Sequence, residues 1–137
     1  MIRARALLPL LAAALASCGP APADTPETPG RYELLTENGY HLLIVQSSPA
    51  PIPLQADFSL SVEIHESTGT QALVTEASLA AQLIGPGGAE SSPEVTAHGD
   101  GTFTVSGLRC DTSGEWEIAL DVLRQRVSDR AVVRFSL

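Results

Sequence analysis

Two cysteines and three histidines are the side chains of this chain best suited to bind a metal ion or to form a covalent bond. They are Cys18, Cys110, His41, His65 and His98. Thiolates and imidazoles, together with thioethers, are the ligands that copper(I) prefers. Because the only methionine is Met1, the rest of the chain has no thioether. These residue types therefore favour a soft metal such as copper as the ligand. The chain offers few side chains that could bind it.

The metal candidates are Cys110, His98 and His41, and the expected strands keep them apart. His98 flanks the turn Gly99-Asp100-Gly101 and should pair across it with Thr102. Cys110 lies eight residues beyond Thr102, which is about 26 Å along an extended strand. Nothing in the sequence brings His41 close to Cys110. The alternative interpretation of Cys110 is a buried cysteine that packs as a small apolar side chain.

Cys18 closes a segment with the layout of a secretory signal peptide. Two arginines precede the apolar residues 6–16, and Leu15-Ala16-Ser17 leads directly into Cys18. This ending resembles the bacterial lipoprotein box, in which the cysteine sulfur receives a diacylglyceryl group before cleavage. The apolar run is about half the length that a membrane-spanning helix needs, and it contains a proline. We therefore expect residues 1–17 to be removed and Cys18 to carry the lipid.

A lipidated Cys18 places the protein in the cell envelope, anchored to a membrane. Two or three acyl chains hold a protein stably, whereas one chain gives only marginal binding. If the host has two membranes, Gly19 after the cysteine favours the outer membrane, with the protein facing the periplasm. The alternative is an ordinary secretory signal in which the cysteine occurs by chance.

Residues 18–30 are expected to form the lipidated N-terminus and a proline-rich tether. Four prolines stand among small and polar residues between Gly19 and Gly30, a composition that favours extended polyproline-like geometry. Twelve such residues reach roughly 37 Å at about 3.1 Å per residue. This length would hold a folded domain clear of a lipid surface.

The charge of the chain argues against two kinds of partner. All 8 basic residues are arginines; loss of the two in the leader leaves 6 against 16 acidic residues, a net charge of −10. Such a surface repels nucleic acid and anionic lipid headgroups.

The sequence also has no Gly-x-Ser-x-Gly turn and no glycine-rich phosphate loop. We therefore expect neither enzymatic activity nor a cofactor.

Residues 31–137 alternate apolar and polar side chains with a period of two. The clearest segments are residues 58–65, 116–122 and 132–137. This alternation is typical of antiparallel strands with one buried face. Asn38-Gly39 predicts a hairpin with a type I′ turn, which needs positive φ at both central residues. We expect seven or eight strands in an all-β, immunoglobulin-like antiparallel sandwich, with residues 72–83 a bent strand and Trp116 at the centre of the core.

Three segments together resemble the YtkA-like domain, a small immunoglobulin-like sandwich of exported bacterial proteins. They are Ala50-Pro51-Ile52-Pro53-Leu54 with the strand from Phe58, Pro93-Glu94-Val95-Thr96 with Gly99 to Leu108, and Ser113-Gly114-Glu115-Trp116-Glu117-Ile118. The resemblance covers roughly residue 40 to the C-terminus and implies copper handling. The histidine and methionine motifs that relatives carry are missing from residues 85–90 and 110–114, so no ligand is transferred residue by residue.

These observations favour a non-enzymatic, lipid-anchored envelope protein whose sandwich binds an envelope protein or a small ligand. The first alternative is envelope metal handling, with copper as the metal. A second alternative follows from Cys18: once that cysteine carries lipid, Cys110 has no partner in its own chain. Cys110 is then either a free thiol or the site of an intermolecular disulfide.

The lipid-anchor interpretation predicts a defect in processing when Cys18 is replaced. In Cys18→Ala, or after treatment of cells with globomycin, the unprocessed chain should accumulate, because lipidation of the cysteine precedes cleavage. Immunoblots of whole cells would show a band larger by the mass of the 17-residue leader. Normal processing of Cys18→Ala would contradict the anchor.

Overall fold

The computed structural model describes residues 28–137. The predicted signal peptide, Cys18 and residues 18–27 of the predicted tether lie outside the described residues. Within residues 28–137, no helix has the length and apolar character needed to cross a membrane.

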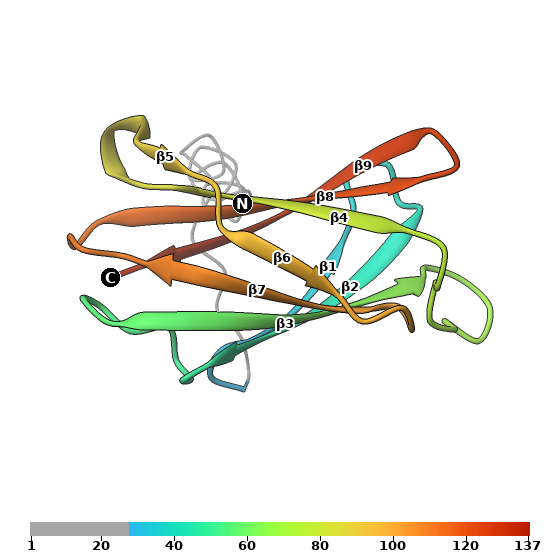
Figure 1. Ribbon diagram of the computed structural model, residues 1–137, viewed down its shortest axis with the longest axis horizontal. Coiled ribbons are helices and arrows are strands. Elements are labelled where there is room, and N and C mark those ends of the chain that lie inside the picture. The colour runs from blue at the N-terminus through green and yellow to red at the C-terminus, as the bar shows by residue number, and fades with distance from the viewer. Residues whose placement is uncertain (1–27) are drawn as a thin grey trace, which may run out of the picture.

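The described residues form nine strands in two antiparallel sheets, which stack as a sandwich (Figure 1). The five-stranded sheet has the order β1-β2-β3-β7-β6. Its strands are β1 (Arg31–Leu35), β2 (His41–Ser48), β3 (Asp57–Glu66), β7 (Thr102–Arg109) and β6 (Glu94–Ala97). The four-stranded sheet has the order β5-β4-β8-β9. Its strands are β5 (Glu90–Ser91), β4 (Ser78–Ile84), β8 (Glu115–Arg124) and β9 (Val127–Ser136), and a 3-10 turn, η1 (Pro86–Gly88), joins β4 to β5.

The predicted all-β, immunoglobulin-like sandwich is confirmed, with one strand more than the expected seven or eight. The additional strand is β5, whose two residues pair only with Leu83 and Ile84 of β4. The segment 72–83, expected to be one bent strand, becomes a strand only from Ser78. Before it the chain is irregular, and the N–H of the buried Val74 donates to the carbonyl of Ile64 at 2.8 Å.

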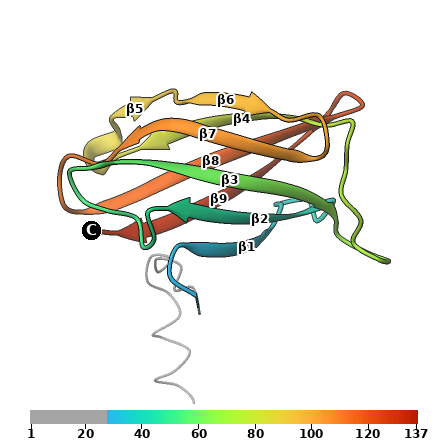
Figure 2. The same ribbon diagram turned by 60° about the horizontal axis from the view of Figure 1, so that its bottom comes forward.

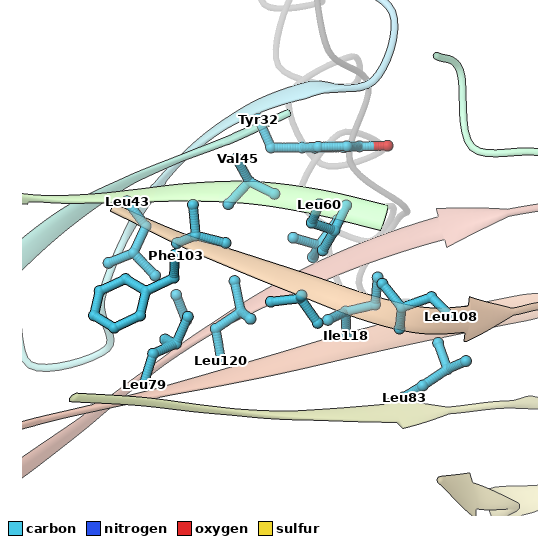
Figure 3. Close-up of a cluster of buried hydrophobic side chains, with 14 of the residues drawn as sticks. Tyr32, Leu43, Val45, Leu60, Leu79, Leu83, Phe103, Leu108, Ile118 and Leu120 are labelled. Atoms are coloured by element: carbon cyan, nitrogen blue, oxygen red, sulfur yellow. The ribbon is translucent and has the colours of Figure 1, made fainter. Parts of the chain in front are cut away.

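The alternating residues of each strand form the inner faces of the two sheets. Phe58, Leu60, Val62 and Ile64 of β3 are all less than 5% exposed. Across the sandwich, β8 contributes Ile118, Leu120 and Val122 to the same core. Figure 3 shows side chains of both sheets meeting in this layer: Leu43, Val45 and Leu60 on one side and Leu79, Ile118 and Leu120 on the other. Burial of these apolar surfaces is the main force that holds the sheets together.

Trp116 does not fill the centre of the core, contrary to the prediction. It lies half-buried near the start of β8, and its indole N–H donates to the carbonyl of Thr112 at 2.9 Å. Its ring packs against Gly85, where a Cβ atom would approach the ring within 2.8 Å. The centre is instead aliphatic, because each strand supplies leucine, isoleucine or valine at its inward positions.

The turns of two hairpins, at residues 36–40 and 125–126, differ from what the sequence predicts. The hairpin at Asn38-Gly39 exists, but the loop spans residues 36–40 and Leu35 pairs with Leu42. Since Gly39 has a φ of +79° and Asn38 has no positive φ, the predicted type I′ turn is wrong. Positive φ at both central positions occurs instead at Gln125 and Arg126, which join β8 to β9 with φ of 51° and 68°.

The sandwich has two ends, which are termed the near end and the far end below (Figures 1 and 2). The chain enters at the near end, where the carbonyl of Gly30 accepts a hydrogen bond from the N–H of Ser47 at 2.8 Å. Leu137 also lies there, because it exchanges two backbone hydrogen bonds with Gly114. The far end is formed by four connections: residues 36–40, 67–77, 98–101 and 125–126.

Candidate interaction surface at the far end

The three residues predicted as metal candidates are not brought together. Cys110 follows β7 at the near end, whereas His41 and His98 lie at the far end. His41 begins β2 and His98 follows β6, so β3 and β7 separate them in the sheet. His98 is exposed, and its Nε2 is 2.8 Å from the hydroxyl of Thr104. Among residues 28–137, no group of three or more histidine, cysteine, aspartate or glutamate side chains is arranged to hold a metal ion.

Cys110 belongs to the apolar core. It is a free cysteine with 0% exposure, and its carbonyl accepts a hydrogen bond from the N–H of Gln55 at 2.8 Å. Burial raises the pKa of its thiol to about 11, and the carboxylate of Asp111 contributes to the increase. The thiolate is the form that binds metals and forms disulfides. In the folded protein Cys110 therefore packs as a small apolar side chain, and a disulfide to a second chain requires the thiol to leave the core.

Large apolar side chains are exposed mainly at the far end. Within residues 28–137, six large apolar residues are at least 42% exposed. Five of them lie in the far-end loops or in the strand residues beside them: Leu35, Tyr40, Leu73, Leu123 and Val127. The sixth, Leu54, lies at the near end in the connection between β2 and β3. Apolar side chains concentrated at one place on a protein surface are a usual mark of an interaction site.

A buried carboxylate, Asp129 of β9, fixes the loop 36–40 from the opposite sheet. Asp129 is 3% exposed. Its Oδ1 accepts hydrogen bonds from the N–H groups of Asn38 at 2.9 Å and of Arg130 at 3.0 Å, and Oδ2 lies 3.5 Å from the N–H of Tyr40. The N–H of Glu37 also donates to the carbonyl of Arg130, at 2.8 Å. The loop that carries Tyr40 is thus held by several bonds to β9.

The Asp129 carboxylate stays ionised because its hydrogen bonds outweigh its burial. Burial alone would raise the pKa of this group. Hydrogen bonds from the Thr36 side chain and from the N–H groups of Asn38, Tyr40 and Arg130 stabilise the charged form, so the pKa is lowered. Asp129 thus remains charged and serves as a hydrogen-bond acceptor that holds the loop 36–40 in place.

Arg124 connects the β8–β9 hairpin to two other far-end segments. Its Nη1 lies 3.1 Å from both carboxylate oxygens of Glu66 in β3, and its Nε lies 2.8 Å from Oε1 of Glu76 ahead of β4. The hydrogen bonds to Arg124 lower the pKa of Glu76. The hydroxyl of Ser67 donates to the carbonyl of Gly39 at 2.7 Å. The three connections 36–40, 67–77 and 125–126 are therefore linked by polar contacts, and they carry or flank all five exposed apolar side chains of the far end.

His41 lies beneath the loop 36–40 in the row of β2 that faces the core. It is 4% exposed, and its Nδ1 is buried without a hydrogen-bond partner among residues 28–137. Its backbone is held by Thr36, because the N–H of His41 donates to the Thr36 hydroxyl at 3.0 Å and the N–H of Thr36 donates to the carbonyl of His41 at 3.0 Å. Burial lowers the pKa of the imidazole, and the positive charge of Arg124 lowers it further.

Sequence reasoning missed Asp129 and Arg124, which organise this surface. Asp129 contacts Asn38 across 91 positions of sequence, and Arg124 contacts Glu66 across 58. One local signal existed for Asp129: its position belongs to the inward-facing row of β9 together with Ala131, Val133 and Phe135. A charged residue in an apolar row is rarely buried unless it is paired or hydrogen-bonded.

Comparisons of the chain with protein-family models, with curated proteins and with solved structures find no match. The far end is identified as a candidate interaction surface by three features of the structure: exposed apolar side chains, a buried carboxylate and loops linked by hydrogen bonds.

Replacement of Asp129 should destabilise the fold. In Asp129→Ala the N–H groups of Asn38 and Arg130 lose their acceptor, and we expect the free energy of unfolding at pH 7 to fall by about 1–3 kcal/mol. The pKa of Asp129 is lowered by folding, so its contribution is present above the ordinary value of 3.8 and is lost as the pH falls through the folded value. Urea unfolding of both proteins at pH 7 and at lower pH measures the difference.

The matched control for Asp129 is Asp121, a half-exposed carboxylate on the neighbouring strand that forms an ion pair with Arg130 at 2.8 Å. Because surface ion pairs contribute little, Asp121→Ala should cost less than about 1 kcal/mol. Equal effects of the two substitutions would refute the special role of Asp129.

The thiol of Cys110 should be unreactive in the folded protein, because it is buried and its pKa is raised to about 11. In the Cys18→Ala variant, where Cys110 is the only cysteine, Ellman's reagent should react rapidly only after urea is added. Non-reducing gels should show the monomer alone. Rapid reaction in native buffer, or a reducible band at twice the mass, would favour the intermolecular disulfide instead; Cys110→Ser in the same background gives the zero-thiol baseline.

Proposed function

We propose that this protein is a non-enzymatic lipoprotein of the cell envelope, anchored through Cys18, and that its far end binds another envelope protein. The observation that carries this proposal is the distribution of exposed apolar side chains. Five of the six large ones among the described residues lie at the end opposite the point where the chain enters the sandwich.

The composition of the far end supports a protein partner. The centre of a protein interface is rich in aromatic and apolar side chains, and polar residues surround it. Tyr40, Leu123 and Val127 are each about half exposed, and exposed polar residues such as Glu37, Gln125 and Arg126 stand among them. This mixture fits a protein surface better than a metal ion or a nucleic acid.

The internal hydrogen bonds of the far end support the same proposal. Asp129 holds the loop that carries Tyr40, and Arg124 holds the hairpin beside Leu123 and Val127. A surface that is already ordered loses less conformational entropy when it binds, so more of its contact energy contributes to affinity.

The proposed anchor gives the far end a favourable orientation. The chain enters the sandwich at Gly30, and the expected tether before it would reach roughly 37 Å if extended. A domain held by this point would turn its near end toward the lipid surface and its far end away from it. The apolar side chains would then be accessible to proteins in the surrounding compartment.

Site-specific photocrosslinking in living cells tests the proposal. p-Benzoylphenylalanine is placed at Tyr40, at Leu123 and, as the control, at Leu54, which is 43% exposed at the near end. We expect one adduct of the same mass from Tyr40 and Leu123 and none from Leu54. Mass spectrometry of the adduct identifies the partner.

A second substitution distinguishes specific binding from chance proximity. Leu123→Asp should abolish the adduct formed from position 40, because it places a charge in the apolar surface, whereas Leu54→Asp should leave it unchanged. Adducts of equal yield from all three positions, or none from the far end, would reject the far end as the binding surface.

A further inference from the structure

The far end contains a buried titratable side chain, His41, whose ring Nδ1 forms no hydrogen bond among the described residues. Only 4% of the surface of His41 is exposed. It lies directly under the loop 36–40, and its backbone is hydrogen-bonded to the hydroxyl and to the N–H of Thr36. Buried polar atoms are satisfied in the great majority of cases, so an exception in a native structure invites an explanation.

The groups that face His41 from the surrounding elements are Arg124 of β8, Glu66 of β3, Asp129 of β9 and Glu76 ahead of β4. The three carboxylates favour a charged imidazole, whereas burial and Arg124 oppose it, and the net effect lowers the pKa. The carboxylates are already engaged: Glu66 and Glu76 bind Arg124, and Asp129 binds the loop. None of them is bonded to Nδ1.

In the protonated ring both nitrogens carry a hydrogen, so Nδ1 is a buried N–H donor without an acceptor. Protonation would also add a second positive charge in the region of Arg124. Both effects favour conformations in which the imidazole reaches water. Because His41 begins β2 immediately after the loop, an opening of residues 36–41 away from β9 would expose the ring.

We propose that His41 makes the far end sensitive to pH: its protonation releases the loop 36–40 from Asp129 and so alters the surface that carries Tyr40. The consequence for binding rests on the proposed function of the far end, whereas the opening itself does not. Opening breaks the bonds of Asn38 and Tyr40 to Asp129, of Glu37 to the Arg130 carbonyl and of Ser67 to the Gly39 carbonyl.

The sign and range of the effect follow from linkage. In the closed state His41 binds a proton less readily than at its ordinary value of 6.5, so opening takes up a proton. The equilibrium constant for opening should then rise as the pH falls below 6.5, by up to about tenfold per pH unit. Asp129, whose pKa is lowered from 3.8, stays ionised over this range and does not produce the effect.

Hydrogen exchange of the whole protein, purified in detergent, measures the opening. We expect the protection factors of the Asn38 and Tyr40 amides, corrected for intrinsic exchange rates, to fall several-fold between pH 6.5 and 5.5. The amides of Leu120 and Val62, in the centres of β8 and β3, should keep theirs. Protection at Asn38 and Tyr40 that is independent of pH would overturn the proposal.

Two variants and a direct titration assign the effect to His41. His41→Leu, which fills the site with an apolar side chain, should remove the pH dependence, and His98→Gln, which removes the exposed far-end histidine, should preserve it. If His41→Leu does not fold, NMR titration of the imidazole in the wild-type protein decides: a pKa of 6.5 or above would refute the proposal. None of these measurements needs a partner, so failed crosslinking and failed pH sensing are separate results.

Discussion

The contact between the inner faces of the two sheets is the interaction on which every other feature of this protein depends. It exists because apolar side chains recur at every second position, as in Phe58 to Ile64 and Ile118 to Val122. Two faces with this pattern exclude water only when they are stacked against each other. The stacking then determines which loops meet at each end, and so it assembles the far end from segments that are distant in sequence.

At the far end the sandwich must satisfy backbone groups that no strand pairs. The loop 36–40 presents N–H groups toward β9, and the buried carboxylate of Asp129 accepts that of Asn38 at 2.9 Å and lies 3.5 Å from that of Tyr40. Asp129 also accepts the N–H of Arg130 in its own strand at 3.0 Å. The same carboxylate joins the first loop of the fold to its last strand. One polar residue in an apolar row therefore connects the edges of the two sheets and positions an exposed tyrosine, so that packing and the presentation of a surface are coupled.

The fold was largely predictable, since its information is local. The alternation in β3 and β8 predicts strands with the correct inner face, and the turn at Gly99 to Gly101 occurs where expected. The turn type at Asn38-Gly39 was not predictable, because the hydrogen bond of Asn38 to Asp129 favours a longer loop over the two-residue turn that the local sequence prefers. The Gln125-Arg126 turn gave no signal, since neither residue is typical of positive φ.

The candidate surface was much less predictable than the fold. The histidines and Cys110 attracted attention as donors, but their chemistry is set by burial, which composition does not reveal. His98 is an exposed residue beside a threonine, whereas His41 is buried among charges from four segments. The pairing of Arg124 with Glu66 and Glu76 depends on the sheet order. The sequence alone does not distinguish Arg124 from the other arginines as the partner of these two carboxylates.

Gly30 and Leu137 lie at the same end of the sandwich, and this has a consequence for how such a domain is combined with others. Apart from the two-residue β5, the chain passes between the two ends eight times, and an even number of passes brings it out at the end where it entered. A segment continuing beyond Leu137 would therefore leave from the near end, where the chain enters. Further modules joined in this way, in nature or as engineered fusions, would leave the loops at the opposite end uncovered. The topology thus keeps both points of attachment away from the far-end loops.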